Sequence, residues 1–301
     1  MKSLFRKVIT TFYLLLLLNI TAKAQLNLFG SSYFQNQYLN NASYAGLTNG
    51  LQVSGGLSNL WTIIPGSPKK QFFTANYGAA NSRYGLGLIL KNEKAGLIRK
   101  TNVEVSWSYH VPLGREDEQL NFGMSLGIQD QRIDLSELDA DQNDVQITRF
   151  NDEENQFDAD FGISYTSNKL NLQASLPKLR SLFNQSVDNG INKIDFLAAL
   201  SYKLESRASS GLFNGMSAEP KLVLRSIRGH NDIIDVGAQI GFSGDILSLL
   251  YMYHSSKSNS FGFKMKYDER YQLLGIYSTN TSETKNYVNS NFEVGLKVII
   301  F

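Results

Sequence analysis

The chain of 301 residues contains no cysteine, which excludes disulfide bonds, thiolate zinc sites, thiol nucleophiles and lipid attachment at a cysteine. Proline is scarce, with five residues, and the hydrophobic fraction of 42% is too high for a disordered chain. Beyond the first 24 residues, no segment reaches the roughly 18 consecutive apolar residues of a transmembrane helix. The zinc-protease motif H-E-x-x-H is also missing. The sequence therefore predicts no enzyme and no cofactor.

The first 24 residues have the three-part layout of a secretory signal peptide. A basic start, Lys2 to Lys7, precedes the apolar run Val8 to Ile20, and Ala22-Lys23-Ala24 is a small-x-small cleavage site. The apolar run has about 13 residues, which is short of the roughly 20 that a membrane anchor needs. We therefore expect cleavage after Ala24 and a mature chain that begins at Gln25. Cleavage removes four basic residues, so the formal net charge changes from +2 to −2.

Strict alternation of apolar and polar residues dominates the chain from about residue 50 onward. Val103, Val105 and Trp107, for example, fall on one face, and the intervening Glu104 and Ser106 fall on the other. Side chains alternate across a strand, so each such segment is predicted to be a strand with one apolar and one polar face. About fourteen segments show the pattern: 50–61, 71–79, 83–91, 100–113, 118–130, 156–167, 169–176, 193–204, 219–228, 233–243, 245–255, 259–267, 270–278 and 290–301.

Two architectures could use such strands. A soluble β-sandwich turns its apolar faces inward, whereas a transmembrane barrel turns them toward lipid and lines its lumen with polar residues. Three features favour the barrel: polar faces rich in glycine, aromatic residues near the strand ends, and a last strand that stops on Phe301. We therefore predict an all-β fold, a transmembrane antiparallel β-barrel of about 14 strands over residues 50–301. The aromatic residues expected at the membrane interfaces are Tyr84, Tyr109, Tyr165, Tyr202, Phe242, Tyr267 and Tyr277.

The lengths of the connections predict which rim of the barrel faces which side of the membrane. We expect an even number of strands and an amino-terminal segment in the periplasm. The short connections then fall on the periplasmic side, as does one longer connection, 204–219. The other long connections fall on the external side, which is the usual asymmetry of such barrels. The short connections are 79–83, 113–118, 166–169, 243–245 and 267–270, and the external long ones are 61–71, 130–156, 176–193 and 278–290.

The acidic stretch 130–160 holds eleven carboxylates and two arginines. Within it, Asp139-x-Asp141-x-Asn143 has the spacing of calcium ligands, because a hard cation needs several oxygens from a tight loop. A calcium loop also needs glycine and glutamate at its sixth and twelfth positions, which are Asp144 and Phe150 here. We therefore expect no metal and interpret the stretch as a solvated external loop or a contact surface for a basic partner. The near-neutral balance of the whole chain gives no support to a nucleic-acid partner.

Charged residues of both signs are predicted on the inner faces of the strands. They either pair across the lumen and close the barrel or form a selective pore, and we favour pairing because buried charges need partners. Of the three histidines, His110 is expected to face the lumen, and His230 and His254 to lie at strand ends. The predicted inner charges are Glu104, Asp158, Asp160, Asp195 and Asp235 against Lys203, Lys221, Arg225, Lys264, Lys266 and Lys297.

Residues 25–49 do not alternate cleanly, and they fit a periplasmic extension or a plug of the lumen better than a strand. One motif here runs from Gln37-Tyr38 through Tyr44-Ala45-Gly46, and a second comprises Trp61, Ile64, Gly66 and Pro68. With these two motifs the chain resembles the PorP/SprF family, which comprises outer-membrane proteins of the type IX secretion system and gliding machinery. Its length, signal peptide, glycine-rich strands and acidic loop after the fifth strand also agree with that family. It departs from the family at Ala42, where proline is usual, and at Leu60, where a polar residue is common.

The resemblance implies an accessory component of the cell outer membrane that supports secretion or surface attachment of a large adhesin-like client. It also implies association with other type IX secretion or gliding components, and no catalysis. The alternative is an outer-membrane diffusion or solute-uptake channel, which the charged lumen would suit. Trp61 is equally interpretable as an interfacial anchor. The residues expected to contact partners are Trp61, Pro65, Gly66 and Pro68; Asp139, Asp141 and Asp144; and Gln37, Tyr38, Asn40, Tyr44 and Gly46.

Overall fold

The computed structural model describes residues 36–62, 66–80, 83–114, 117–134, 145–152, 155–179, 194–206, 214–227, 232–279 and 288–300. The expected signal peptide, its cleavage site and several residues singled out above lie outside these ranges: Pro65, Asp139, Asp141, Asp144 and His230. The side chains of Trp61 and Asp195 are not described either.

Antiparallel strands make up nearly all of the regular structure. Two 3-10 helices, η2 (Gln37–Leu39) and η3 (Ala42–Tyr44), precede them, and the helix α2 (Val145–Asn151) lies between β5 and β6. The strands are β1 (Gly50–Thr62), β2 (Lys69–Gly78), β3 (Tyr84–Ala95), β4 (Ile98–Pro112), β5 (Gln119–Ile133), β6 (Gln156–Thr166), β7 (Leu170–Leu176), β8 (Ile194–Tyr202), β9 (Leu204–Glu205), β10 (Ser217–Ile227), β11 (Ile233–Phe242), β12 (Leu247–His254), β13 (Ser258–Tyr267), β14 (Tyr271–Thr279) and β15 (Val288–Ile299).

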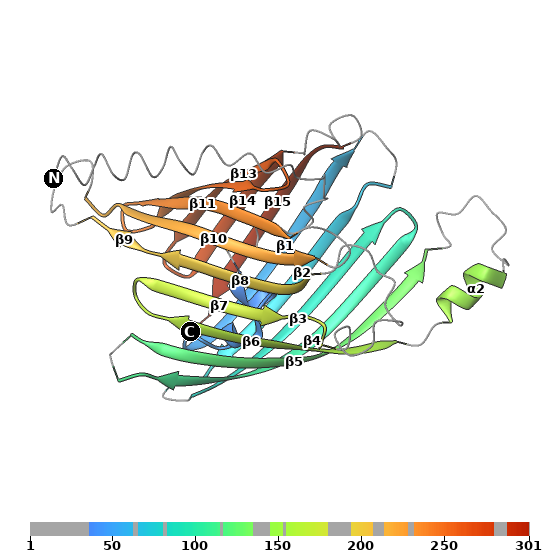
Figure 1. Ribbon diagram of the computed structural model, residues 1–301, viewed down its shortest axis with the longest axis horizontal. Helices are drawn as coiled ribbons and strands as arrows, with labels where there is room; N and C mark the ends of the chain where they lie inside the picture. Colours follow the sequence, from blue (N-terminus) through green and yellow to red (C-terminus); the bar gives the residue numbers. More distant parts are fainter. Residues whose placement is uncertain are drawn as a thin grey trace.

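The strands form one closed antiparallel barrel (Figure 1). Successive strands pair with one another, and β15 returns to pair with β1 from Gln52–Ile299 to Thr62–Val288. The short β9 continues β8 and pairs with the same neighbour, β10, so that fourteen strands form the wall. Closure leaves no open sheet edge, which a backbone surrounded by lipid requires.

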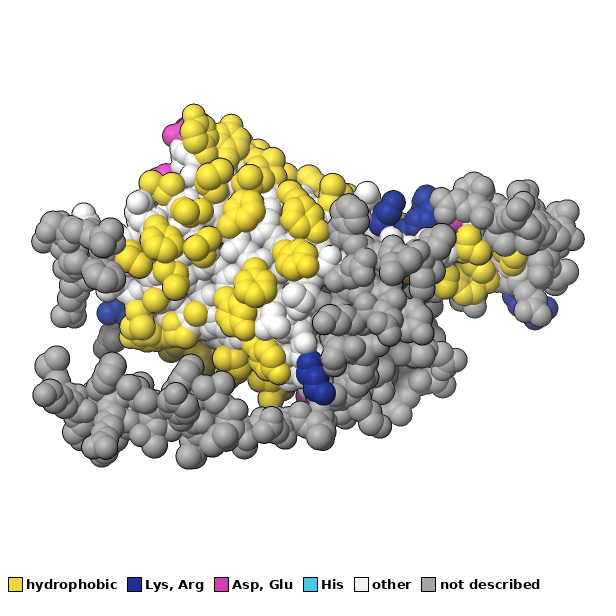
Figure 2. All heavy atoms as spheres, turned by 90° about the horizontal axis from the view of Figure 1, so that it is seen from above, with side chains coloured by type: hydrophobic (Ala, Val, Ile, Leu, Met, Phe, Trp, Pro, Cys, Tyr) yellow, Lys and Arg dark blue, Asp and Glu magenta, His cyan; other side chains and the backbone are white. Residues whose placement is uncertain are grey.

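The apolar side chains of the wall point outward. On β4, Val105 is 60% exposed and the adjacent Ser106 is 1% exposed. On β5, Leu126 is 69% exposed and the adjacent Ser125 is 3% exposed. Figure 2 shows apolar side chains spread over one outer face of the wall. An apolar outside and a polar inside distinguish a membrane barrel from a soluble sandwich, so the predicted fold is confirmed.

The strand boundaries agree with the predicted ones to within about four residues, which is the usual precision of sequence periodicity. One rim, which we call the short-turn rim, carries the tight connections after β2, β4, β6, β11 and β13. The opposite long-loop rim carries the connections after β5, β7 and β14, and also tight turns after β3 and β12. The helix α2 in the acidic stretch was not predicted, because a helix of seven residues is too short to show a period. In the described ranges no helix has the length and hydrophobicity to cross a membrane.

Aromatic side chains gather near the short-turn rim. The ring of Tyr84 on β3 lies 5.9 Å from that of Trp107 and 5.2 Å from that of Tyr109, both on β4. The rings of Tyr267 and Tyr271 lie 6.4 Å apart across the β13–β14 turn. Aromatic residues in such a band sit at the level of the lipid headgroups and fix the depth of a barrel.

Part of the lumen is apolar, which differs from the prediction of a polar inner face. Leu197, Val223, Leu250 and Met252 point inward from β8, β10 and β12 and pack into a buried cluster. This cluster explains why β12 is apolar on both faces: its outward residues face lipid, and its inward residues pack on the neighbouring strands. Alternation marks the two faces of a strand, but it does not show that some inner positions are buried among apolar neighbours.

Candidate functional site: the plugged lumen

The amino-terminal segment enters the barrel and packs on its inner wall. Residues 36–46, which we call the plug, form η2 and η3, with Tyr38, Leu39 and Tyr44 buried. Asn41 caps η3, because its Oδ1 accepts a hydrogen bond from the Ser43 backbone N at 3.0 Å. Of the two expectations for this segment, extension or plug, the second describes these residues.

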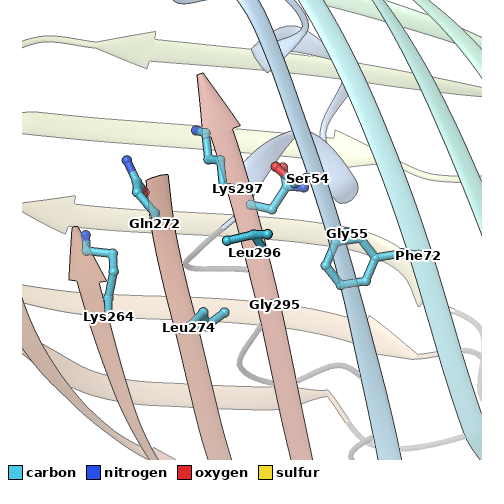
Figure 3. Close-up of a pocket in the computed structure, with 10 residues that line it drawn as sticks. Ser54, Gly55, Phe72, Lys264, Gln272, Leu274, Gly295, Leu296 and Lys297 are labelled. Atoms are coloured by element: carbon cyan, nitrogen blue, oxygen red, sulfur yellow. The ribbon is translucent and has the colours of Figure 1, made fainter. Parts of the chain in front are cut away.

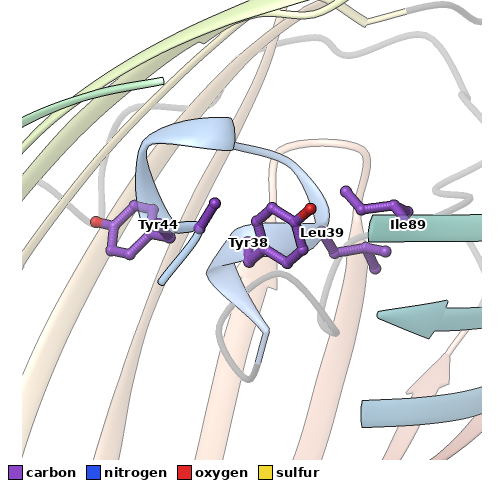
Figure 4. Packing of buried hydrophobic residues seen from close by; sticks show 5 residues of the cluster. Tyr38, Leu39, Tyr44 and Ile89 are labelled. Atoms are coloured by element: carbon purple, nitrogen blue, oxygen red, sulfur yellow. The ribbon is translucent and has the colours of Figure 1, made fainter. Parts of the chain in front are cut away.

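The first part of the plug is fixed to β3 and β4. Tyr38 Oη donates a hydrogen bond to Ser106 Oγ at 2.9 Å. Leu39 packs in one buried cluster with Tyr38 and with Ile89 of β3. Figure 4 shows Tyr38 and Leu39 on the side of Ile89, whereas Tyr44 projects away from it. Burial raises the pKa of the Tyr38 phenol above its ordinary value, so its hydroxyl remains a neutral donor.

The second part of the plug is fixed to β6 and β7 by side-chain hydrogen bonds. Burial also raises the pKa of the Tyr44 phenol, so this hydroxyl too remains protonated. The bonds of Asn41 and Ser43 join buried polar groups, so losing one partner would cost the other part of its hydrogen bonding away from water. The bonds join Asn41 Nδ2 to Gln173 Oε1 (3.1 Å), Ser43 Oγ to Ser164 Oγ (2.9 Å) and Tyr44 Oη to Asn171 Oδ1 (2.6 Å).

Glycines of the inner wall leave room for the plug backbone. A Cβ atom added at Gly123 of β5 would lie 2.2 Å from the carbonyl carbon of Ala42. Gly46 ends the plug with a φ of +59°, and a Cβ atom there would lie 2.3 Å from the carbonyl oxygen of Tyr77. Only glycine suits such close approach and such a backbone angle. The glycine-rich inner faces that predicted a lumen therefore also mark where the plug sits.

His110 of β4 joins the end of the plug to the wall. Its Nδ1 lies 2.9 Å from Asn121 Oδ1, and its Nε2 lies 3.1 Å from the carbonyl oxygen of Ala45. Ser108 Oγ donates to the same carbonyl at 2.5 Å. His110 thus faces the lumen as predicted, with Nε2 on the plug and Nδ1 on Asn121 of the wall strand β5.

Charged side chains of the lumen pair along the wall. Lys91 Nζ on β3 lies 3.1 Å from Glu104 Oε1 on the adjacent β4. Arg225 Nη2 on β10 lies 2.7 Å from Asp235 Oδ2 on the adjacent β11. Opposite charges therefore pair as predicted, but between neighbouring strands. Neighbouring strands are only about 4.8 Å apart, so these partners are within easier reach than those on the opposite wall.

An Asp–His–Ser chain lies near the long-loop rim. Asp235 Oδ1 is 2.6 Å from His254 Nδ1, and His254 Nε2 is 2.7 Å from Ser260 Oγ. This order occurs in serine hydrolases, where the serine must be open to a substrate carbonyl. Ser260 is 0% exposed and its Oγ lies 2.7 Å from Ser278 Oγ. We therefore interpret the chain as a buried hydrogen-bond network that joins β11 to β14.

The two sequence motifs occupy different parts of the barrel. Sequence reasoning did not single out Asn41, although the Asn-x-Ser spacing of an Asx cap is a recognisable signal for its role. Partner contact stays a prediction for both groups of motif residues. Those inside the barrel are Gln37, Tyr38, Asn40, Tyr44 and Gly46. Those at the long-loop rim, in or between β1 and β2, are Trp61, Gly66 and Pro68.

Comparison with known proteins gives a family and a fold. Residues 22–298 match the family model described as type IX secretion system membrane protein PorP/SprF. No curated protein matches the chain. The Ralstonia pickettii toluene transporter TbuX is similar in structure, with a TM-score of 0.51 and 9% identity over 93% of this chain and 96% of that chain. The Acinetobacter baumannii outer membrane protein Omp33 gives a TM-score of 0.47 and 7% identity over 85% of this chain and 100% of that chain. At 9% identity, the likeness to TbuX shows the barrel fold alone.

Proposed function

Because the chain belongs to the PorP/SprF family of type IX secretion system membrane proteins, we propose that this outer-membrane barrel supports the secretion or surface attachment of a large adhesin-like client. The observation that carries the proposal is the plugged lumen, together with the family. The plug bonds to inner side chains from β2 to β7, so a fixed segment occupies one side of the lumen. A barrel whose lumen is partly occupied in this way suits a membrane platform for partner proteins.

Each rim has its own part in this proposal. We infer that the short-turn rim, where the plug leads into β1, faces the periplasm and that other secretion or gliding components could bind there. The long-loop rim would then face outward and present Trp61, Pro65, Gly66 and Pro68 to the client. The acidic stretch at the same rim, with Asp139, Asp141 and Asp144, offers a second surface for a basic partner.

Deletion of the gene tests the secretion role. We expect cells without the protein to lose one or a few large surface proteins, while the other outer-membrane proteins keep their levels. Expression of the wild-type chain should restore the lost proteins. Quantitative proteomics of the cell surface and the culture medium measures both effects, and an unchanged set of secreted proteins would contradict the proposal.

The alternative, a diffusion or solute-uptake channel, makes a different prediction. A channel should conduct ions when the purified barrel is inserted into a planar lipid bilayer, and its conductance should rise when residues 36–46 are removed. A platform barrel should conduct little in its native form. A large steady conductance of the native chain would favour the channel.

A further inference from the structure

Three lysines cluster on the inner face of β13 and β15, near the short-turn rim. The strand register places Lys266 of β13 opposite Gln272 of β14, and Gln272 opposite Lys297 of β15. Lys264 is the next inward-facing residue along β13. Directly opposed side chains of an antiparallel pair have Cβ atoms about 5 Å apart. The three ammonium groups therefore share one patch of the inner wall.

Within the described residues, no carboxylate is paired with any of these lysines. None of their side chains has a hydrogen bond or an ion pair with another residue in the described part of the chain. The carboxylates whose charges act on Lys264 are Glu219 and Asp245. Glu219 lies 2.9 Å from Lys221, and Asp245 lies 2.9 Å from Lys203, so both already have a lysine partner. The cluster thus differs from Lys91 with Glu104 and Arg225 with Asp235, which pair along the wall.

The cluster borders a pocket between the wall and the plug. Lys264, Gln272 and Lys297 line it from three successive strands, with Ser54 of β1 and Asn36 of the plug completing its polar side. Figure 3 shows Lys264, Gln272 and Lys297 side by side on three adjacent strands, with Ser54 beside Lys297. The pocket has a cavity volume of about 30 Å³, whereas a cavity of about 10–15 Å³ holds one water molecule. That space can take a group larger than a single water molecule.

We propose that this pocket binds a small soluble anion that carries phosphate or carboxylate groups. Lys264 and Lys297 supply two ammonium groups, and the Gln272 amide supplies neutral donors that match the several acceptor oxygens of such an anion. The ligand also offsets the mutual repulsion of the three lysines. Phe72 and Leu274 line the remaining side, which suits a compact carbon skeleton. The inference rests on the lumen itself and is independent of the secretion role.

The position of the pocket limits the source of the anion. The pocket lies inside the closed wall, whereas the acyl chains of a phospholipid stay in the bilayer outside that wall. A lipid headgroup therefore cannot reach the lysines without leaving the membrane. A water-soluble anion can enter through a rim of the barrel.

Calorimetric titration of the purified full chain in detergent micelles tests the site, with inorganic phosphate and citrate as separate probes at constant ionic strength. We expect at least one probe to bind saturably at one site per barrel. The double variant Lys264→Gln/Lys297→Gln should weaken that binding at least tenfold. The matched control Lys69→Gln/Lys257→Gln removes the same charge from exposed residues at the long-loop rim and should leave the affinity unchanged.

Three outcomes would overturn the proposal: no saturable binding of either probe, equal affinity in the lumen variant, or equal loss in the control variant. Heat-modifiable migration on a gel shows whether each variant is a folded barrel. Should the lumen variant not fold, acetylation of the wild-type barrel replaces it. The bound probe should then protect Lys264 and Lys297, but not Lys69, and lack of protection would refute the site.

Discussion

Two glycines with a similar backbone angle differ in what surrounds them. Gly46 has a φ of +59° and a Cβ atom there would lie 2.3 Å from the Tyr77 carbonyl oxygen, whereas Gly244, with a φ of +69°, has nothing within 4 Å. We predict that Gly46→Ala lowers the free energy of unfolding by about 2–5 kcal/mol, because backbone strain and overpacking add. Gly244→Ala should lower the free energy of unfolding by only about 1–2 kcal/mol, because it adds backbone strain without overpacking. Urea unfolding of the purified barrels measures the difference, and equal losses would mean that the plug does not seat as described.

The buried ion pair of Arg225 and Asp235 provides the second residue-scale prediction. Asp235 also contacts His254, so removal of the arginine leaves a buried carboxylate with one partner fewer. We expect Arg225→Met to lower the free energy of unfolding by about 3–5 kcal/mol. Arg132→Met removes an ion pair with Asp130 in which the arginine side chain is 64% exposed. It should lower the free energy of unfolding by less than about 1 kcal/mol. Urea unfolding in one detergent compares the two, and a loss at Arg225 as small as that at Arg132 would argue against a tight buried network.

At the scale of elements, the absence of cysteine allows a direct test of the plug. A single Ser43→Cys substitution places the only thiol of the chain at a position that is 0% exposed. We predict slow labelling by a maleimide in the folded barrel and at least tenfold faster labelling when Asn41→Ala is added. Asn41 caps η3 and bonds to β7, so its loss should open the plug locally.

The neighbouring Asn40 is the matched control for this test. Its side chain has no hydrogen bond in the described part of the chain, so Asn40→Ala should leave the labelling rate nearly unchanged. Similar rates for the Asn40 and Asn41 variants would show that the cap does not hold the plug in place.

A cluster at the short-turn rim joins β8, β10 and the β11–β12 turn and makes stability depend on pH. Burial alone would raise the pKa of Asp245, but hydrogen bonds from Ser217 and Lys203 lower it. A carboxyl group whose pKa is lowered in the folded protein stabilises the fold at pH values above its unfolded pKa near 4. This stabilisation is lost as the pH falls through the pKa of the folded state. We predict that Asp245→Asn lowers the free energy of unfolding by less than about 1 kcal/mol at pH 7, because the site is partly exposed.

The difference between the wild type and Asp245→Asn should shrink when urea unfolding is repeated below pH 4. Burial alone would lower the pKa of Lys203, but hydrogen bonds with Asp245 and Glu205 raise it, so its stabilising contribution persists up to its ordinary pKa near 10. Asp268→Asn, an exposed turn position, serves as the matched substitution. If the wild type and Asp245→Asn differ in free energy of unfolding by the same amount at pH 3 and pH 7, the lowered pKa of Asp245 is contradicted.

Sequence periodicity was sufficient for the strands but not for their interior. Alternation predicted all fourteen wall strands, because one face of each must meet lipid and the other must not. It did not predict that Leu250 and Met252 would pack on Val223, since a pattern along one strand contains no information about its neighbours. It likewise placed Tyr38 and Tyr44 in a motif without showing that their hydroxyls bond to the wall. Those contacts join residues far apart in the chain, and only the closed barrel brings them together.

At the scale of the whole molecule, the barrel has two chemically different openings. The short-turn rim combines the lysine-lined pocket, the plug and the tight turns, whereas the long-loop rim carries the acidic stretch. A partner or ligand that is recognised by its charge would therefore bind the two rims differently.

Strand β4 runs from one rim of the barrel to the other. The turns at its two ends therefore allow a test of which rim faces the outside of the cell. Gly96 follows β3 at the long-loop rim and Gly114 follows β4 at the short-turn rim; both are exposed, have a positive φ and have nothing within 4 Å of an added Cβ. Cysteine is therefore tolerated equally at the two positions. We predict that a membrane-impermeant maleimide labels Gly96→Cys on intact cells and labels Gly114→Cys only after the outer membrane is permeabilised. The reverse result would place the short-turn rim, and with it the plug and the lysine-lined pocket, on the outer surface of the cell.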